Sequence, residues 1–419
     1  MYLFLRAYAT IPDFINDILG TEIARYPINT YGFFVAMGFF VAAIAANIEL
    51  KRRGELGLLP SKKATVIEGV KVKWTDLISP FIVWFLFGFK LLGAVIFDVD
   101  LLRQGQDSVA YILSLQGFWG VGILTGLLAA GYTYYSIKKK ELTPPVSKQI
   151  TVGPEESIGE LVIVAAIFGI MGSSIFEIIQ PNSTMTFVEL FSDPMNFISG
   201  LTIFGGLFFG IIGIFIYSKW RKIKPFQLFD SLAPGFILAN GVGRLGCHFS
   251  GDGDWGKANL SEAPSWIPDY FWSNNYAHNV LDACTTYVSK NVATVESSAC
   301  ARIAECEGLY CHELATGVWP TSIYEFVMLV VLFFVLWAVR KKFTAAPGFI
   351  FAFFFVLAGL ERFPIEYLRV TDTYPAFFNF TQAQIISIVM ILGGLVGMGF
   401  LYAKHKDAIQ RSSFKATKL

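Results

Sequence analysis

Long apolar stretches alternate with short polar segments along the chain. Each apolar stretch is about 20 residues long, the length that an α-helix needs to cross the hydrocarbon core of a bilayer. Because lipid offers no hydrogen-bond partner to unpaired backbone groups, we expect these stretches to be helical. The pattern predicts nine spans, over residues 30–49, 76–98, 116–136, 159–179, 198–218, 228–248, 321–339, 347–366 and 382–403.

The composition favours the same fold class. The chain has 419 residues, of which 54% are hydrophobic and 16% charged, and its mean hydropathy is +0.54. So apolar a chain is not expected to stay in solution, which favours an all-α polytopic membrane protein. The 41 Phe and 9 Trp residues are typical of a lipid-facing surface with aromatic belts at its two interfaces. We therefore expect the bilayer, and no nucleic acid, as a partner.

Basic residues concentrate in alternate loops, which predicts an orientation. Lys and Arg are enriched in cytoplasmic loops of membrane proteins. The basic segments are 51–53, 62–63, 138–140, 219–224, 340–342 and the tail from Lys404. The segments 99–115 and 180–197 carry few basic residues and are expected outside. Nine spans then give an outer N-terminus and a cytoplasmic C-terminus.

This topology divides the chain into five parts. They are an N-terminal interfacial segment over 1–29, helices one to six over 30–248, an extracytoplasmic loop domain over 249–320, helices seven to nine over 321–403, and a cytoplasmic tail over 404–419. Four cysteines lie in the outer loop: Cys284, Cys300, Cys306 and Cys311. An oxidising compartment would allow one or two disulfides, although their pairing does not follow from the sequence.

The hairpin over 76–136 resembles the one that follows it. Phe87–Asp98 is similar to Phe168–Glu177, and each segment precedes a second glycine-rich helix. One interpretation is a duplicated hairpin. The other is that any two glycine-rich membrane hairpins look alike, because small residues suit helix contacts.

Polar residues cluster at the outer end of the sixth span, in the run Gly241–Gly256. The cluster contains Arg244, Cys247, His248, Ser250, Asp252 and Asp254. Ionisable residues at membrane depth are costly and tend to face a bundle interior or a polar cavity. The glycines at 251, 253 and 256 permit turns that a side chain would block, and such turns beside Arg244 form a nest for an oxyanion.

The residues of this run also correspond to two other kinds of site. A Cys-His nucleophile from Cys247 and His248 is disfavoured, because adjacent residues on a helix point in different directions and no third group orients the histidine. A metal site from His248, Asp252 and Asp254 is conceivable, but the chain has only four histidines. We expect neither a metal nor a cofactor.

A second polar cluster lies at the end of the eighth span. Arg362, Glu366 and Arg369 stand at i, i+4 and i+7, beside Glu361, and share one face of an α-helix. Glu366 is then able to bridge both arginines and hold a fork that suits a phosphate. The alternative is an interhelical salt bridge, or arginines that extend to lipid phosphates. Two guanidinium clusters in one hydrophobic chain suggest a site for an anionic, lipid-borne group.

These motifs together resemble those of the prolipoprotein diacylglyceryl transferase family. Gly243-Arg-Leu-Gly-Cys-His-Phe-Ser-Gly-Asp-Gly-Asp-Trp-Gly256 is similar, with one extra residue, to the family's Gly-Arg-(Leu/Ile)-Gly-Asn-Phe-x-Asn-Gly-Glu-x-Trp-Gly. Phe229-Asp230-Ser-Leu-Ala-Pro234 resembles its Asp-x-x-Ala-Pro, and Trp319-Pro-Thr-Ser-Ile-Tyr-Glu325 its His-Pro-(Ser/Thr)-Gln-Leu-Tyr-Glu. Arg362-Phe-Pro-Ile-Glu366-Tyr-Leu-Arg369 resembles its Phe-Arg-x-x-x-Glu-x-x-Arg, and Tyr31-Gly32 its Tyr-Gly. The family has seven spans, so the resemblance marks 76–136 as an extra hairpin and 257–318 as an enlarged outer loop.

The resemblance implies an activity and its substrates. The family transfers the diacylglyceryl group of phosphatidylglycerol to the lipobox cysteine of a prolipoprotein signal peptide and releases glycerol phosphate, at the bacterial plasma (inner) membrane. The implied lipid-binding residues are Tyr31, Arg244, Cys247, Ser250, Asp252, Gly256, Arg362, Glu366 and Arg369. Arg244 and Arg362 are also expected to stabilise the leaving phosphate.

Several positions depart from the family's pattern. Phe204 stands in place of the family's histidine, so His248 becomes the candidate base. Cys247 and Ser250 replace two asparagines, Asp252 replaces a glutamate, and Ala358 replaces a tyrosine. A catalytically silent relative that binds phospholipid or lipoprotein is therefore an alternative. A membrane transporter is another, although the ionisable residues lie near the outer interface, apart from Lys90, rather than at the midplane.

Overall fold

The computed structural model describes most of the chain, and most of what it describes is helical. The described residues are 6–21, 28–98, 111, 114–179, 186–192, 203–281, 301–303, 306, 310–371, 373–375 and 378–416. They form two compact units, one from Met1–Leu59 with Ser218–Leu419, the other from Pro60–Tyr217.

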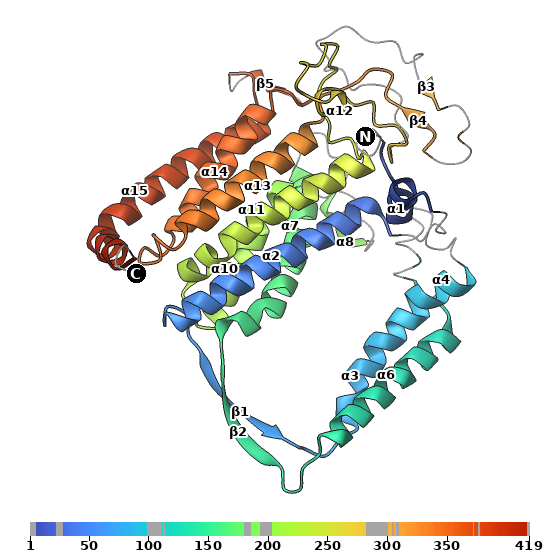
Figure 1. The fold of residues 1–419 in the computed structure, drawn as a ribbon, viewed down its shortest axis with the longest axis vertical. Coiled ribbons are helices and arrows are strands. Elements are labelled where there is room, and N and C mark those ends of the chain that lie inside the picture. The colour runs from blue at the N-terminus through green and yellow to red at the C-terminus, as the bar shows by residue number, and fades with distance from the viewer. Residues whose placement is uncertain are drawn as a thin grey trace. The chain divides into compact units, whose positions relative to one another are not determined.

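The first unit is a bundle of long helices that lie side by side (Figure 1). The helices are α2 (Thr30–Glu55), α11 (Pro225–Ser250), α13 (Thr321–Val339), α14 (Phe349–Ile365) and α15 (Gln382–Ala416). Helix α11 packs against α2 and α13, and α14 packs against α15. A buried apolar core joins α11, α13 and α14, with Ile237, Leu329 and Ile350 almost without solvent contact.

Glycines bring α2 and α11 into close contact. A Cβ atom at Gly38 would lie 2.9 Å from the carbonyl oxygen of Ala239, and one at Gly235 would lie 2.9 Å from that of Ala42. Neither carbonyl is free to move, because each belongs to a helix backbone. The pair of glycines therefore sets the separation of the two helices, as small residues do in membrane bundles.

Short elements cover one end of this bundle. They are α1 (Ile11–Leu19), α12 (Asp269–Trp272), the antiparallel pair β3 (Ala301–Arg302) and β4 (His312–Glu313), and the antiparallel pair β5 (Thr373–Tyr374) and β6 (Phe380–Thr381). Helix α1 lies in the segment predicted to be interfacial, and it begins where the Thr10 hydroxyl accepts from the amide of Asp13.

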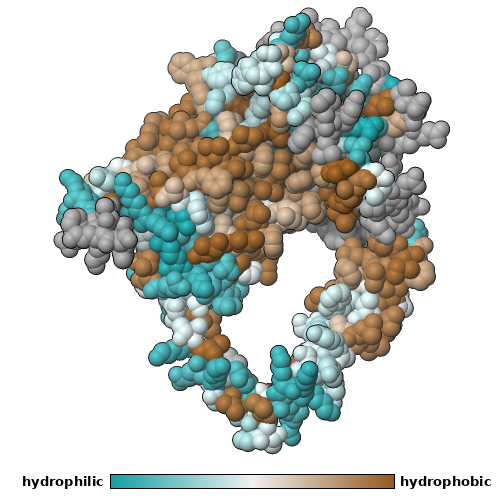
Figure 2. Space-filling model, in the orientation of Figure 1, coloured by the Kyte–Doolittle hydropathy of each residue, from teal (hydrophilic) through white to brown (hydrophobic). Residues whose placement is uncertain are grey.

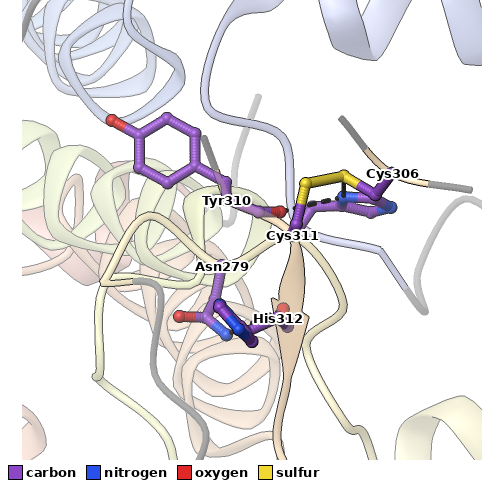
Figure 3. Close-up of a disulfide and its surroundings, with 6 residues drawn as sticks. Asn279, Cys306, Tyr310, Cys311 and His312 are labelled. Carbon is purple, nitrogen blue, oxygen red and sulfur yellow. Dashed lines mark hydrogen bonds between the residues drawn. A yellow bond between two sulfur atoms is a disulfide. The ribbon is translucent and has the colours of Figure 1, made fainter. Parts of the chain in front are cut away.

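The predicted outer loop domain has a small core and a disulfide. Trp255, Tyr276, Leu314 and Val318 are buried together. Cys306 and Cys311 are joined, and the backbone oxygen of Tyr310 beside them accepts a hydrogen bond of 3.0 Å from His278 Nδ1 (Figure 3). Cys284 and Cys300 lie outside the described residues.

The second unit contains two helical hairpins and a β-ribbon. Its helical elements are α3 (Thr75–Leu86), η2 (Phe87–Leu92), α4 (Gly93–Phe97), α6 (Trp119–Lys139), η4 (Pro154–Ser157), α7 (Ile158–Ile179), α8 (Phe187–Ser192) and α10 (Ile203–Trp220), which ends at the unit boundary. The ribbon pairs β1 (Lys62–Glu68) with β2 (Val146–Val152) in antiparallel register, from Lys62 opposite Val152 to Glu68 opposite Val146. No strand was predicted in these segments.

The second predicted span is not a uniform α-helix, because η2 is a π-helical turn between α3 and α4. Lys90 lies in this turn, and its ammonium donates to the backbone oxygens of Tyr111, Ser114 and Gln116 at 2.5–2.7 Å. These three bonds satisfy a charge that lipid would not solvate. The π-helical turn and the hydrogen bonds of Lys90 therefore belong to the same local structure.

In each hairpin of this unit, a glycine lies where the two helices approach most closely. A Cβ atom at Gly88 would lie 2.8 Å from the backbone oxygen of Val121 on α6, and one at Gly172 would lie 2.5 Å from that of Gly205 on α10. The duplication of the hairpin stays a prediction, because small residues serve such contacts with or without common ancestry.

The helix lengths and composition indicate a multi-pass membrane protein. Among the described residues, five helical segments are long and apolar enough to cross a bilayer: Thr30–Glu55, Thr75–Phe97, Pro154–Phe176, Thr321–Val339 and Gln382–Gln410. In the first unit, hydrophobic side chains cover the middle of the helices and hydrophilic ones gather towards the ends (Figure 2).

The last helix differs from the predicted span of 382–403. Helix α15 continues to Ala416 across non-helical backbone at His405, with φ −115° and ψ 15°. The segment predicted as a tail therefore begins as helix, after a break where the apolar sequence gives way to Lys404, Lys406 and Asp407.

Buried charges hold the other end of the first unit together. Glu49 accepts from Arg53 at 3.0 Å and from Arg340 at 3.1 Å, which joins α2 to the end of α13. Asp230 lies 3.5 Å from Arg53 and accepts from the amides of Gly348 and Phe351, both at 2.9 Å. This carboxylate therefore caps the N-terminus of α14 while it balances a fully buried arginine.

We expect Asp230→Ala to lower the free energy of unfolding by about 3–5 kcal/mol, because it removes one of the two carboxylates around the buried Arg53 and both cap acceptors of α14. Unfolding of the purified protein in mild detergent measures the change. Asp407→Ala, at an exposed position of α15, is the matched control and should leave the midpoint unchanged. Equal midpoints for the two variants would contradict the assigned role of Asp230.

Candidate functional site

The first site residue, Arg244, lies near the C-terminal end of α11, and glycines turn the chain back over it. The helix ends at Ser250, and Gly251 adopts the left-handed conformation with φ 62°. A Cβ atom there would lie 2.8 Å from that of Asn279, so only glycine fits without displacement. A second left-handed glycine, Gly253 with φ 97°, then brings Asp254 onto the guanidinium of Arg244.

The returning segment is fastened to two other elements. The backbone oxygen of Asp254 accepts from the hydroxyls of Thr321 and Ser322, at 3.1 and 2.6 Å, in the first turn of α13. Gly256 forms an antiparallel bridge with Arg369, where a Cβ atom would lie 2.6 Å from the backbone oxygen of Leu368. This close approach places Arg369 beside Asp254.

Three arginines and three carboxylates then form one ion-pair network. Arg244 pairs with Asp254 and Glu325, and Arg369 pairs with Asp254. Arg362 donates to Glu325 at 2.7 Å and also pairs with Glu366. The sequence predicts that Glu366 contacts both nearby arginines, and its carboxylate also lies 3.6 Å from Nε of Arg369. The network joins α11, the segment after it, α13, α14 and the turn that follows α14.

The contact between Glu366 and Arg369 does not arise from the shared helical face that the sequence predicted. Helix α14 ends at Ile365, so Arg369 lies beyond it in a turn. Arg369 contacts Glu366 because the two residues are three positions apart. The backbone bridge between Arg369 and Gly256 fixes the orientation of Arg369.

The network is largely shielded from solvent. The side chain of Glu325 is 1% exposed, that of Arg244 6%, and those of Arg362 and Arg369 16% each. Arg244 Nε and Arg369 Nε lie near carboxylates but donate no well-aligned hydrogen bond within the described residues. Each of these buried nitrogens already faces a carboxylate oxygen, so the surface open to a further anion lies along the partly exposed side chains of Arg362 and Arg369.

Electrostatics favour the ionised form of Asp254. Burial alone would raise the pKa of this carboxyl, but Arg244, Arg369 and Arg362 outweigh it and hold the pKa well below its usual range. Burial also opposes the charge of Arg369, yet Asp254 and Glu325 raise its pKa above the ordinary value. By contrast, burial and the charge of Asp254 raise the pKa of Asp252.

Other predicted residues lie around this network. Cys247 makes a side-chain hydrogen bond with Asp252, and Tyr31 on α2 is within electrostatic range of Arg244, Cys247 and Asp254. Tyr31 also lies against α11, because a Cβ atom at Gly246 would be 3.2 Å from its backbone oxygen.

His248 and Ser250 have different surroundings. His248 is buried, with Nδ1 3.1 Å from the hydroxyl of Tyr276 and its ring against Phe249. The Ser250 hydroxyl is 3.5 Å from the backbone oxygen of Cys247 on its own helix. The side chain of Phe204 lies outside the described residues.

Two members of the network were not among the predicted site residues. Glu325 is the carboxylate shared by Arg244 and Arg362, and it is an isolated charge at the start of an apolar helix, which was the available signal. Asp254 pairs with Arg244 and Arg369, whereas the acidic residue predicted for the lipid site was Asp252. No group of three His, Cys, Asp or Glu side chains suited to a metal occurs in the part of the chain that the structure describes.

The family model described as prolipoprotein diacylglyceryl transferase matches residues 109–400. This range contains the complete ion-pair network, begins within the hairpin predicted to be extra, and leaves Tyr31 outside.

Similar proteins carry one name, phosphatidylglycerol–prolipoprotein diacylglyceryl transferase. The one from Staphylococcus haemolyticus is 25% identical over 262 residues, which cover 62% of this chain and 78% of that protein. Those from Corynebacterium efficiens and Corynebacterium diphtheriae are each 28% identical, over 58% and 59% of this chain and 68% and 78% of their own lengths. The chain belongs to the prolipoprotein diacylglyceryl transferase family.

Proposed function

We propose that this chain transfers the diacylglyceryl group of phosphatidylglycerol to the cysteine thiol of a prolipoprotein and releases glycerol phosphate. The carrying observation is the convergence of Arg244, Arg362 and Arg369 at one end of a membrane bundle, where the side chains of Arg362 and Arg369 stay partly exposed. Family membership and the names of the relatives support this choice of lipid and acceptor.

The lipid phosphate binds between Arg244 and the pair Arg362 and Arg369. Planar guanidinium groups suit phosphate oxygens, and those in this network are held in position before the lipid arrives. Glu325 and Glu366 act by positioning, since each contacts two of these arginines. Tyr31, Cys247, Ser250, Asp252 and Gly256 complete the proposed lipid site.

The reaction is a displacement at carbon. The cysteine sulfur forms a bond to the glycerol carbon that carries the phosphate, and the bond from that carbon to the phosphate oxygen breaks. The electron pair stays on the leaving glycerol phosphate, whose growing charge the arginines stabilise. A thiol with an ordinary pKa of about 8.5 attacks as its thiolate, which the same cationic surroundings favour. His248 stays our candidate base on the sequence argument, although its described contacts are with Tyr276 and Phe249.

The proposed topology places this chemistry at the outer leaflet of a bacterial plasma membrane. The nine spans, outer N-terminus and cytoplasmic C-terminus follow from the positions of basic loops. The segment 249–320 is then an extracytoplasmic domain through which a prolipoprotein signal peptide with its lipobox cysteine reaches the site. The hairpin 76–136 is the addition to the family's seven spans.

A second candidate is a relative that binds phosphatidylglycerol without transferring it. Phe204 and Ala358 favour this possibility, because they replace a histidine and a tyrosine of the family's pattern. The two candidates share lipid binding and differ in whether an adduct forms.

We expect purified protein, phosphatidylglycerol and a lipobox peptide to give a peptide heavier by one diacylglyceryl group, detected by mass spectrometry. Arg362→Ala should slow this transfer by about 100-fold or more, because one aligned donor to a developing anion contributes about that much. Arg302→Ala, at an exposed position of β3, is the control and should keep the wild-type rate. Lipid binding without any adduct from the wild type would favour the silent relative, and an undiminished rate in Arg362→Ala would refute the phosphate site.

Asp254→Asn should destabilise the protein in a pH-dependent way. Because the folded pKa of Asp254 lies below the unfolded value of about 3.9, its stabilisation is complete above that value and is lost as the pH falls through the folded pKa. The variant should therefore lose about 3–5 kcal/mol at pH 7, and its difference from the wild type should shrink below about pH 4.

Denaturant unfolding in detergent at a series of pH values measures this difference. Asp269→Asn, at an exposed position in α12, is the matched control and should track the wild type throughout. A destabilisation of Asp254→Asn that is independent of pH would show that packing, and not charge, accounts for its role.

A further inference from the structure

Among the described residues, one carboxyl group in the arginine site has no ion-pair partner. Glu361 lies on α14 directly before Arg362, and it is 6% exposed. Its Oε1 atom is buried and makes no hydrogen bond, and no Lys, Arg or His side chain of the described chain lies within 4.0 Å of the carboxyl oxygens. Asp254 and Glu366 each contact two of the arginines, and Glu325 contacts all three.

Glu361 is nevertheless part of the same electrostatic environment. It interacts with Glu325 on α13, with Arg244 on α11, and with Arg362 and Arg369 in its own segment. Against α15, the backbone beside Glu361 packs through Gly359 onto Ser387 and Ile391, which carry no charge. These four charged groups all belong to the arginine site.

A charge count shows which form of Glu361 fits a bound lipid. The charges of Arg244, Arg362 and Arg369 are matched by those of Asp254, Glu325 and Glu366. A phosphodiester adds one negative charge to this neutral set. An ionised Glu361 would add a second, buried and without a partner, which is a costly arrangement. The lipid-bound site therefore favours a neutral Glu361 that carries a proton.

The leaving group needs such a proton. When the bond from carbon to oxygen breaks, the phosphate changes from a diester with one charge to a monoester whose second charge grows on the departing oxygen. A positioned acid that shares its proton with that oxygen lowers the barrier. Arginine does not supply this proton, because its guanidinium stays protonated in proteins.

We propose that Glu361 is the general acid of this site and gives its proton to the departing phosphate oxygen of the lipid. The proposal rests on the proposed function. Sulfur bonds to the glycerol carbon, the electron pair of the broken bond goes to the phosphate oxygen, and the Glu361 proton follows it there. The proton released by the attacking thiol restores the carboxyl group, so a complete cycle consumes none.

The sequence agrees with a change of proton carrier in this chain. The family motif has phenylalanine before its first arginine, and this chain has Glu361 there. At the position of the family's histidine the chain has Phe204. The chain thus has an acidic group at one position and lacks a titratable group at the other.

Glu361→Gln in the full-length protein is the direct test, because glutamine keeps the size and hydrogen-bonding capacity of the side chain but transfers no proton. We measure the single-turnover rate of adduct formation on a lipobox peptide, and the retention of phosphatidylglycerol by the purified protein. We expect the rate to fall by about 100-fold or more relative to the wild type, with lipid retention unchanged. Glu361→Asp, which keeps an acid on a shorter side chain, should recover part of the rate. Glu55→Gln, at the exposed last residue of α2, is the control for loss of one carboxylate and should keep the full rate.

The outcomes separate the two proposals. A wild-type protein that forms an adduct and a Glu361→Gln variant that forms it equally fast would overturn the role of Glu361 and leave the transferase function in place. A variant that loses lipid retention together with turnover would also overturn it, since Glu361 would then serve binding or folding. A wild-type protein without any adduct would overturn the proposed function and the general acid with it.

Discussion

The contact on which the site depends is the carboxylate of Glu325 held between Arg244 and Arg362. It links three helices, α11, α13 and α14, through charges that are almost fully withdrawn from solvent. A buried guanidinium is tolerated only when it is paired, so each of these helices needs the others in place. The turn after α11 and the segment after α14 then pack against this fixed contact. Asp254 reaches Arg244 and Arg369 at that point, and Gly256 allows the close backbone contact that keeps them there.

The two ends of the first unit use the same chemistry for different purposes. At one end, Glu49, Arg53 and Asp230 have no solvent exposure, and Asp230 uses both oxygens to cap α14. With no exposed atom to present to a ligand, this network acts as a structural clamp. At the other end, the side chains of Arg362 and Arg369 keep some exposure. That network is rigid because it is paired, and part of its guanidinium surface still faces outward.

The sequence predicted the helices well, because the length of an apolar stretch is a local property and the bilayer fixes what length is needed. It failed where structure depends on distant partners. The π-helical turn around Lys90 depends on carbonyl oxygens more than 20 residues later, and the ribbon of β1 and β2 pairs segments about 80 residues apart. The arginines could be recognised one by one, since a charge in an apolar run is conspicuous. The arginines pair with Asp254 and Glu325 rather than with Asp252. This pairing depends on three-dimensional packing that no single motif encodes.

Pairing the arginines before the lipid arrives has a consequence for catalysis. Free arginines would bind a phosphodiester more strongly, but they would also have to be ordered at that moment, and uniform binding of the ground state adds nothing to the rate of the chemical step. Arginines already neutralised by carboxylates attract a singly charged diester only modestly. Their aligned guanidinium groups gain most when the phosphate acquires its second charge, because that charge appears inside a site already oriented to receive it. The carboxylates that compete with the substrate for the arginines thereby favour the transition state over the bound lipid.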